Sequence, residues 1–494
     1  MKKLILTIII FLAVSVISLA QIGEVKILSS DGAEDDNFGH SVSISGDYVI
    51  VGVPNDDDNG MTSGSVYIFK RDGTNWAEEQ KLTASDGAEV DMYGYSVSIS
   101  GDYALVGVPG DKDYGDYTGS AYVLKREGIS WVEKQKLIAS DAEEDDHFGW
   151  SVAISEEYAV IGAVAEATNG HQSGAAYIFK REGDSWLEKQ KLIASDGTDN
   201  EFFGWEVAIS KDFVVIGCPE DEDNGSDAGA VYIYNRVDTS WLEMQKLLAS
   251  DGAGDDNFGR SVSISNNYIV VGSPFDDDKG NRSGSAYMFK LNGSNWIEEQ
   301  KLTASNGSEH HNYGTSVSIY GQTAIVGTWI ANSVYLYKFE NFNWIEDEII
   351  VPSDGTGSEQ FGTSISLDYN KLISGARGDD DNGTGSGSAY INFNFIVGVE
   401  NEQLKDPLSY NLNQNYPNPF NPTTSIKYKI PEFNFVTLKI YDVLGNEIIT
   451  LVNEEKPVGS YKVELNATSL PSGIYFYRLQ AGSFVETKKM VFLK

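Results

Sequence analysis

The chain of 494 residues has a single cysteine, Cys218, and comparatively few basic side chains. One cysteine excludes an intramolecular disulfide, so packing must supply the stability. Lys and Arg number 36 against 73 Asp and Glu, which gives a formal net charge of -37. A field of that sign repels nucleic acid and anionic membranes and attracts cations. We therefore expect no nucleic-acid partner.

Long apolar runs are missing after residue 20. The N-terminus carries Lys2 and Lys3, an apolar run over residues 4–17 and a small-residue cleavage site at 18–20. This pattern predicts a removable signal peptide over residues 1–20. No later stretch approaches the roughly 18 apolar residues that a membrane-spanning helix needs. We expect the mature chain to be a monomer without a transmembrane segment.

What the chain has in quantity is a repeat. A Phe-Gly or Tyr-Gly pair recurs at five spacings of 55 residues and one of 48, with its glycine at Gly39, Gly94, Gly149, Gly204, Gly259, Gly314 and Gly362. Each unit holds four short segments of period-two alternation, which in the first unit are residues 38–44, 48–54, 64–70 and 76–83. Seven such units predict an all-β, seven-bladed β-propeller over residues 22–396.

The two ends of the repeat predict how the propeller is completed. The seventh unit stops after its third strand, and residues 24–30 (EVKILSS) stand where later units have their fourth strand. We predict that this N-terminal strand pairs with the third strand of the seventh unit and closes the propeller. Closure would remove the exposed sheet edges of an open array.

The loops between the second and third strands are acidic. Alternating strand direction puts them on the same face as the loops that join consecutive units, which contain Asp31, Asp86, Asp141, Asp196, Asp251 and Asp354. Alternate aspartates followed by glycine suit a hard cation. The sequence therefore predicts calcium ligands at Asp56, Asp58, Asp111, Asp113, Asp221, Asp223, Asp276, Asp278, Asp379 and Asp381. The alternative is that these are simply solvated turns, which Asp, Asn and Gly favour.

The position directly after the Phe-Gly pair varies among units: His40, Tyr95, Trp150, Trp205, Arg260, Thr315 and Thr363. In the sixth unit the acidic loop also shrinks to residues 329–332. These departures predict ligand-binding residues at Trp150, Trp205, Arg260 and Trp329, for an extracellular glycan or protein ligand. Packing between blades, and neutral drift in the sixth unit, are the alternatives.

No enzyme signature stands out. The five histidines show no zinc spacing, and no serine or cysteine nucleophile has a recognisable context. We expect no catalytic residues and a non-enzymatic protein. The alternative is an extracellular polysaccharide-active lyase or hydrolase that uses the acidic face.

The C-terminal part differs in charge. Residues 411–494 carry 9 Lys plus Arg against 7 Asp plus Glu, which leaves 27 against 66, or -39, for the rest. Period-two segments separated by Gly, Pro and Asn turns predict a small Ig-like β-sandwich over residues 411–494, after a linker at 397–410.

Two resemblances follow from these motifs. The units resemble FG-GAP repeats, the blades of the integrin α-subunit propeller, and more closely a bacterial variety with Val-Gly-x-Pro and Gly-Ser-x-Tyr. The tail resembles the type A C-terminal sorting domain of type IX secretion cargo, on residues 415–422 and 473–494. Together they imply export through the periplasm by the type IX machinery, an extracellular or outer-surface location, and a binding or adhesion function.

The resemblance to integrins carries over no metal ligands. The integrin-type calcium loop lies between the first and second strands of a blade, where this chain has only a turn of two to four residues. Calcium, if bound, would have to be held by the acidic loops themselves.

Overall fold

The computed structural model describes residues 23–393 and, in the C-terminal part, 410–430, 434–443, 445–456, 459–468, 470–482 and 484–494. The predicted signal peptide and almost all of the predicted linker lie outside the described residues. The chain divides into two units, Met1–Val397 and Gly398–Lys494. In the described parts, every regular element is a β-strand, and no helix is long and apolar enough to cross a membrane.

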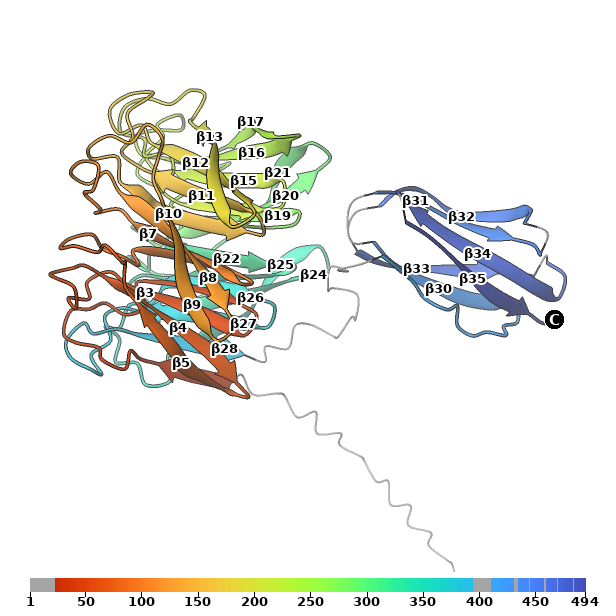
Figure 1. Ribbon diagram of the computed structural model, residues 1–494. Helices are drawn as coiled ribbons and strands as arrows, with labels where there is room; N and C mark the ends of the chain where they lie inside the picture. Colours follow the sequence, from red (N-terminus) through yellow and green to blue (C-terminus); the bar gives the residue numbers. More distant parts are fainter. Residues whose placement is uncertain are drawn as a thin grey trace, which may run out of the picture. The chain divides into compact units, whose positions relative to one another are not determined.

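Seven four-stranded antiparallel sheets build the first unit, which forms the β-propeller of Figure 1. We call them blades 1 to 7. Blades 1 to 3 contain β2 (Ser41–Ser45), β3 (Tyr48–Val53), β4 (Ser65–Asp72) and β5 (Asn75–Leu82); β6 (Ser96–Ser100), β7 (Tyr103–Val108), β8 (Ser120–Glu127) and β9 (Ser130–Leu137); and β10 (Phe148–Ser155), β11 (Tyr158–Ala163), β12 (Ala175–Glu182) and β13 (Ser185–Leu192).

Blades 4 to 6 repeat the same order. They contain β14 (Val207–Ser210), β15 (Phe213–Cys218), β16 (Ala230–Val237) and β17 (Ser240–Leu247); β18 (Ser261–Ser265), β19 (Tyr268–Ser273), β20 (Ser285–Asn292) and β21 (Asn295–Leu302); and β22 (Ser316–Tyr320), β23 (Thr323–Gly327), β24 (Val334–Glu340) and β25 (Asn343–Ile350). Blade 7 contains β26 (Phe361–Asp368), β27 (Lys371–Ala376), β28 (Ser388–Phe393) and β1 (Gly23–Ile27).

The hydrophobic core lies between neighbouring blades. All six residues of β3 are buried, whereas β5 at the outer edge is mostly exposed or half-buried. Adjacent sheets cover the middle strands on both faces, so the sequences of these strands are nearly continuous apolar runs. The phenylalanine of the Phe-Gly pair belongs to this core, since Phe38 packs edge-on against Tyr67 with ring centroids 5.5 Å apart. The tryptophans that recur near the start of the outer strands of blades 1 to 6, such as Trp131, are buried as well.

The repeated glycines hold neighbouring blades at backbone contact. A Cβ atom at Gly52 in β3 would lie 2.0 Å from the carbonyl oxygen of Gly94, in the Phe-Gly type pair of the next blade. No side chain fits at that distance, so this position requires glycine. The same contact recurs at every junction, including that between blade 7 and blade 1, where Gly375 meets Gly39.

A second seam joins the outer strands. The side chain of Gln80 in β5 accepts a hydrogen bond from the backbone N–H of Trp131 and donates one to its carbonyl oxygen, both at 2.9 Å. The equivalent pair recurs four times along the chain: Gln135–Trp186, Gln190–Trp241, Gln245–Trp296 and Gln300–Trp344. Each bond satisfies backbone groups that an edge strand would leave unpaired.

The predicted N-terminal strand is present and pairs with the predicted partner, but it spans Gly23–Ile27 where the sequence predicted residues 24–30. β1 pairs antiparallel with β28, from Gly23 opposite Phe393 to Ile27 opposite Ala389. Each blade nevertheless remains an open four-stranded sheet, and no continuous sheet closes on itself. Blade 7 meets blade 1 through contacts of another kind, such as the Val42 N–H donating to Ser364 Oγ at 3.0 Å.

The C-terminal unit has two antiparallel sheets. One contains β29 (Asn411–Leu412), β30 (Thr423–Ile430) and β33 (Gly459–Asn466), and the other contains β32 (Glu447–Lys456), β31 (Asn434–Tyr441), β34 (Gly473–Ala481) and β35 (Phe484–Phe492). Side chains from both sheets, among them Ile426, Leu438 and Tyr477, form one hydrophobic cluster. The two sheets are consistent with a small β-domain, but the immunoglobulin-like sandwich is not confirmed and stays a prediction.

Deleting β1 should destabilise the propeller. Without residues 23–27, β28 becomes an exposed edge and Ile27 leaves the cluster that joins blade 7 to blade 1. We expect the unfolding temperature measured by scanning calorimetry to fall by several degrees. Truncation after residue 397, which removes the other unit, is the control and should leave that transition in place. An unchanged transition without β1 would contradict the role of this pairing.

Candidate functional site

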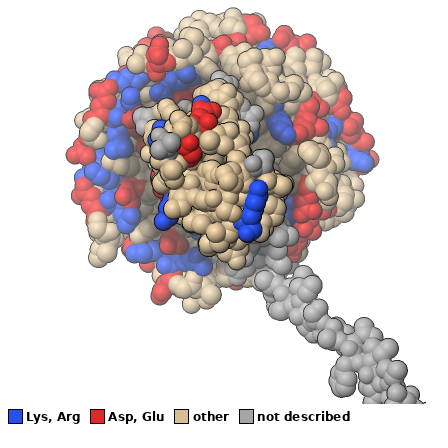
Figure 2. Space-filling model, turned by 90° about the vertical axis from the view of Figure 1, so that its right-hand side faces the viewer, with Lys and Arg blue, Asp and Glu red and all other residues tan. Residues whose placement is uncertain are grey.

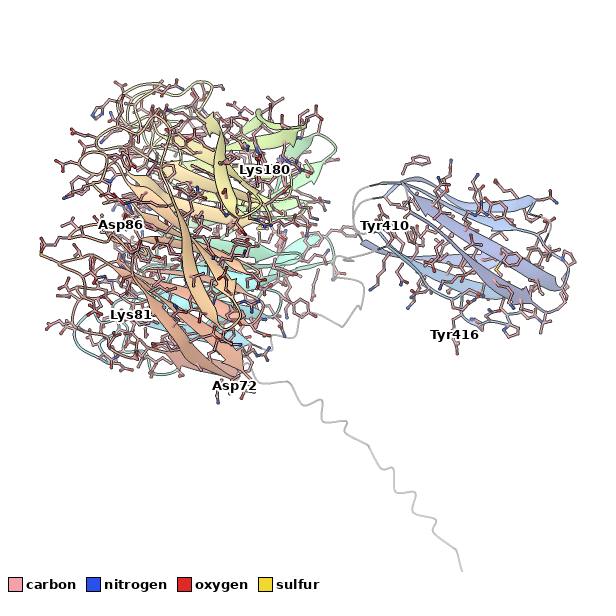
Figure 3. All side chains as sticks on the ribbon, viewed as in Figure 1. Asp72, Lys81, Asp86, Lys180, Tyr410 and Tyr416 are labelled. Carbon is pink, nitrogen blue, oxygen red and sulfur yellow. The ribbon has the colours of Figure 1, made fainter. Side chains whose placement is uncertain are left out.

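The two kinds of acidic loop meet, and a lysine lies between them. In blade 1, Lys81 Nζ is 2.9 Å from an oxygen of Asp31, 2.7 Å from one of Asp56 and 2.6 Å from one of Asp58. Asp31 belongs to the loop that enters the blade, and the other two belong to the loop between β3 and β4. Lys81 and Asp86 lie toward the loop side of the propeller in Figure 3, and Asp72 lies toward the opposite side.

The remaining oxygens of this cluster also have partners. The Tyr67 hydroxyl donates to Asp31 Oδ1 at 2.5 Å, and the Ser65 hydroxyl donates to Asp56 Oδ2 at 2.8 Å. The backbone N–H of Asp58 donates to Asp56 Oδ1 at 3.0 Å. Asp56 is buried, and a buried carboxylate needs such donors to offset its desolvation.

We call this arrangement a lysine–carboxylate cluster, and it recurs in six blades. The other five clusters are Lys136 with Asp86, Asp111 and Asp113; Lys191 with Asp141 and Glu166; Lys246 with Asp196, Asp221 and Asp223; Lys301 with Asp251, Asp276 and Asp278; and Lys26 with Asp354, Asp379 and Asp381. Blade 6 has Ile349 in the place of the lysine and Asn306 in that of Asp31. Blade 6 therefore lacks both the lysine and the acidic residues of the cluster.

The pKa values agree with mutual stabilisation. Partial burial acts to raise the pKa of Asp31, but hydrogen bonds from Tyr67 and Lys81 outweigh it and lower the pKa below its usual range. Burial acts to lower the pKa of Lys81, and its bonds to Asp56 and Asp58 raise it well above the usual value. Both charges are thus held at neutral pH.

The ten aspartates predicted as calcium ligands lie in five of these clusters. Each has an oxygen within 3.0 Å of a lysine Nζ. A divalent ion between the same oxygens would touch the ammonium group, so the carboxylates do not fit calcium while the lysine is in place. Calcium binding therefore stays a prediction. The repeated Lys of Glu-Gln-Lys-Leu and Tyr of Gly-Ser-x-Tyr were the available signals for these partners.

A buried metal-type grouping lies in blade 4. Glu201, Cys218 and Asp221 offer ligand atoms within 4.8 Å of one another, and all three are buried. The Cys218 thiol donates to the Glu201 carbonyl oxygen at 3.2 Å. Asp221 forms a salt bridge with Lys246 at 2.7 Å, so its carboxylate already has a cation. Burial raises the pKa of the thiol well above its usual value. Cys218 thus behaves as a small buried side chain.

Three of the four predicted ligand-binding residues come together near the first strands of the blades. Ring centroids are 4.9 Å apart for His40 and Tyr95, 4.9 Å for Tyr95 and Trp150, and 5.1 Å for Trp150 and Trp205. The Arg260 guanidinium follows, 4.7 Å from the Trp205 ring. We call these five side chains from blades 1 to 5 the collar.

Blades 6 and 7 interrupt the collar. They place Thr315 and Thr363 at the same position, and each hydroxyl bonds to a carbonyl oxygen of its own loop. Trp329, the fourth predicted residue, follows β23 and is 39% exposed. Among the described residues, no ring contact joins it to the collar. Arg377 stands at the equivalent place after β27.

A second row of side chains accompanies the collar in blades 2 to 4. Met92, His147 and Phe202 have φ of 61°, 55° and 55°, a region that bulky residues rarely adopt. The rings of His147 and Phe202 each lie 6.1 Å from the neighbouring collar tryptophan. In blades 1, 5 and 6 the same position holds asparagine, which tolerates this conformation better. At this one position the bulky residues coincide with the aromatic part of the collar, although positive φ also occurs elsewhere, as at Tyr117 and Phe342.

The fold defines a β-propeller followed by a separate β-sheet unit. The signature of the FG-GAP repeat matches residues 23–69, 76–124, 131–179, 186–234, 241–289, 296–337 and 344–392. The chain belongs to the FG-GAP repeat family. Residues 414–493 match a secretion system C-terminal sorting domain. This tail marks cargo of type IX secretion, so the protein is secreted or located at the cell surface.

Similarity to individual proteins is weaker. Integrin alpha-11 is 25% identical over 283 residues in Mus musculus and over 280 residues in Homo sapiens, which is 52% of this chain and 22% of either integrin. The chain thus spans about a fifth of these relatives' length.

Solved structures similar in fold include PorZ, a surface component of the type IX secretion system of Porphyromonas gingivalis. It has a TM-score of 0.45 at 13% identity, over 95% of this chain and 61% of PorZ. Another is the WD40 domain of Toxoplasma gondii coronin, with a TM-score of 0.47 at 10% identity, over 77% of this chain and 87% of that domain.

Replacing Lys246 by methionine should destabilise the propeller on the order of 3 kcal/mol, because buried Asp221 would lose its cation. Lys290, whose pair with Glu299 is more exposed, provides the control; Lys290→Met should cost less than about 1 kcal/mol. Urea titration measures both. With lysines in place we expect no calcium-dependent rise in the wild-type unfolding temperature, and such a rise would support the calcium prediction.

Stability should increase as the pH falls from neutral to about 5. Burial raises the pKa of Asp36, Asp91, Asp146 and Asp256 to about 6. Raised values favour the folded state below the usual carboxyl pKa, and this contribution is lost as the pH rises through 6. Carboxyls with lowered pKa, such as Asp31, act oppositely and lose their contribution only under more acidic conditions.

Calorimetry from pH 3 to 8 tests this expectation. Asp256→Asn keeps an acceptor for the Ala253 N–H, so it should raise the unfolding temperature at pH 7 more than at pH 5. Asp72→Asn at the exposed end of β4 controls for loss of one negative charge. Equal effects of Asp256→Asn at both pH values would contradict the assignment.

Proposed function

We propose that this protein is a non-enzymatic binding or adhesion propeller that acts outside the cell and holds an extracellular glycan or protein ligand at the collar. The observation that carries the proposal is that blades 1 to 4 place rings at the collar position, whereas blades 6 and 7 place threonines there. Tyr95, Trp150 and Trp205 remain partly exposed while their rings contact one another. Partly exposed aromatic clusters are typical of binding surfaces.

Backbone strain next to the collar also supports a binding function. Blades 2 to 4 put Met92, His147 and Phe202 in a conformation that other blades assign mainly to asparagine. Each such residue costs of order 1–3 kcal/mol, and costs of this kind concentrate at functional sites. Packing between blades does not require them, since blades 1, 5 and 6 pack in the same way without them.

We further propose that this binding does not depend on bound calcium. Six lysines occupy the space between the loop carboxylates, and the collar contains none of the predicted calcium ligands. A chelator should therefore leave ligand binding unchanged.

The enzyme alternative would use paired carboxylates of the loop side as general acid and base. In the clusters these carboxylates accept hydrogen bonds from lysine and tyrosine, which favours ionised, fully engaged groups over proton donors. Ligand turnover during binding assays would support the enzyme instead.

The collar is tested with an array of glycans and matrix proteins, using the purified full-length chain. Trp150→Ala and Trp205→Ala should each reduce retention at least tenfold, because an aromatic contact of this kind contributes about 1–3 kcal/mol. Phe342→Ala, at an aromatic residue that is 87% exposed in the turn after β24, is the matched control and should bind like wild type. Unfolding temperatures check that each variant is folded, and undiminished retention by both tryptophan variants would refute the site.

A further inference from the structure

Two arginines in the described part of the chain, Arg260 of the collar and Arg377 of blade 7, form no salt bridge, although the charge of Glu220 acts on Arg260 and partly offsets the lowering of its pKa by burial. Elsewhere in this acidic chain, Arg126 pairs with Asp102 and Arg236 pairs with Asp212. Within the described residues, no carboxylate forms a salt bridge with Arg260 or with Arg377. Within the same residues Arg282 forms no salt bridge either, so Arg260 and Arg377 differ from it by their effect on collar side chains. Figure 2 shows that acidic and basic side chains are otherwise interspersed over the visible surface.

The contacts of these arginines leave hydrogen-bond donors available. Arg260 stacks on two aromatic rings, 4.7 Å from Trp205 and 5.6 Å from Phe275. Arg377 uses its Nε to donate to Gln360 Oε1 at 2.8 Å. Stacking fixes the plane of a guanidinium group without using its N–H groups, so the group can still bind a carboxylate through two parallel bonds.

Both arginines act on the same collar residue. Burial raises the pKa of Tyr95 to about 12, and the charges of Arg377 and Arg260 act against this rise. Arg377 also helps burial to lower the pKa of His40 to about 4, so that this imidazole is neutral. Arg260 from blade 5 and Arg377 from blade 7 therefore direct positive charge toward the same part of the collar.

The acid that directly follows Trp205 in the chain carries little charge. Glu206 in blade 4 stands where most blades have a serine, as Ser41 in blade 1. Burial raises the pKa of Glu206 to about 8, so its carboxyl is mainly protonated at neutral pH. A protonated carboxyl can both donate and accept hydrogen bonds, as a ligand with hydroxyl groups requires.

We propose that the collar binds the carboxylate of a terminal acidic sugar, of the uronic acid class, through Arg260 and Arg377 while the sugar ring packs against Trp150 and Trp205. This inference rests on the proposed function of the collar and names the chemistry of its ligand. An acidic pyranose joins a rigid ring with an apolar face to one carboxylate, which matches aromatic faces next to guanidinium groups.

The surrounding charge restricts the ligand further. The loops of the same units carry most of the net charge of -39 in the region before residue 411. Screening at physiological salt extends over about 8 Å, so a polymer with many carboxylates would be repelled along the acidic loops. A single carboxylate at a chain end avoids this repulsion.

The test compares two ligands that differ only in the carboxylate. Methyl β-D-glucuronide and methyl β-D-glucoside are titrated into the full-length protein and followed by tryptophan fluorescence and calorimetry. We expect the glucuronide to bind at least tenfold more tightly, because hydrogen bonds to a charged group contribute about 1.5–3 kcal/mol. Arg260→Met and Arg377→Met should each remove most of that preference.

Arg282→Met is the matched control. Arg282 also stacks on Phe275, at 4.7 Å, but it is exposed and does not contact the collar rings. The variant should keep the preference for the glucuronide. Trp205→Ala should weaken both sugars, provided that its unfolding temperature stays that of a folded protein.

Three outcomes would overturn the inference. Equal affinity for both sugars, or a preference that survives in both arginine variants, would leave the collar as a binding site but refute the acidic sugar. Arginine-dependent binding of the peptide Gly-Gly-Phe in place of the glucuronide would assign the site to a peptide carboxylate. Loss of all ligand retention on the array, in contrast, would refute the proposed function itself.

Discussion

The close approach of glycine backbones between neighbouring blades is the constraint on which the rest of the propeller depends. Gly52 and its six equivalents lie against the carbonyl of the next Phe-Gly or Tyr-Gly glycine, at a distance that excludes any side chain. The contact brings the first strands of adjacent blades together, and the residue after each pair then meets its neighbour. The collar is a direct consequence of this spacing, because consecutive rings such as Tyr95 and Trp150 come within 4.9 Å.

Charge is organised by the same repetition. A surplus of acids would strain a compact fold through self-repulsion, and each lysine–carboxylate cluster relieves it by placing one ammonium group among two or three carboxylates. Blade 6 shows that the set works as a unit. It lacks the shared aspartates, and Ile349 replaces the lysine. Retaining that lysine would have left a partly buried cation without partners, which is costly.

The side chain at the collar position differs from blade to blade, unlike the repeated glycines. Blades 1 to 4 supply rings and blade 5 supplies Arg260, whereas blades 6 and 7 have threonines at this position and blade 7 adds Arg377 directly after β27. A structural role common to all blades would require similar residues at all seven positions, as it does for the glycines. Variation at one position, beside strained neighbours such as Phe202, instead fits selection for a ligand.

Much of the fold was predictable from the sequence, because the copies of a repeat can be aligned with one another. The seven blades, the N-terminal strand that completes blade 7 and the shared face of the acidic loops all follow from periodicity and strand parity. Trp150, Trp205 and Arg260 were found as variable positions in an otherwise regular pattern. Local alternation and repeat register are properties of the chain itself, so the sequence alone determined them.

Only the tertiary structure decided which charges meet. Lys81 lies 50 residues from Asp31 and 23 from Asp58, and no local pattern reveals that its side chain ends between them. The same holds for Arg377, which affects Tyr95 from the far side of the repeat, and for Trp329, which does not join the collar rings. Electrostatic partners depend on distances between side-chain ends across different strands, and those distances exist only after the blades have packed.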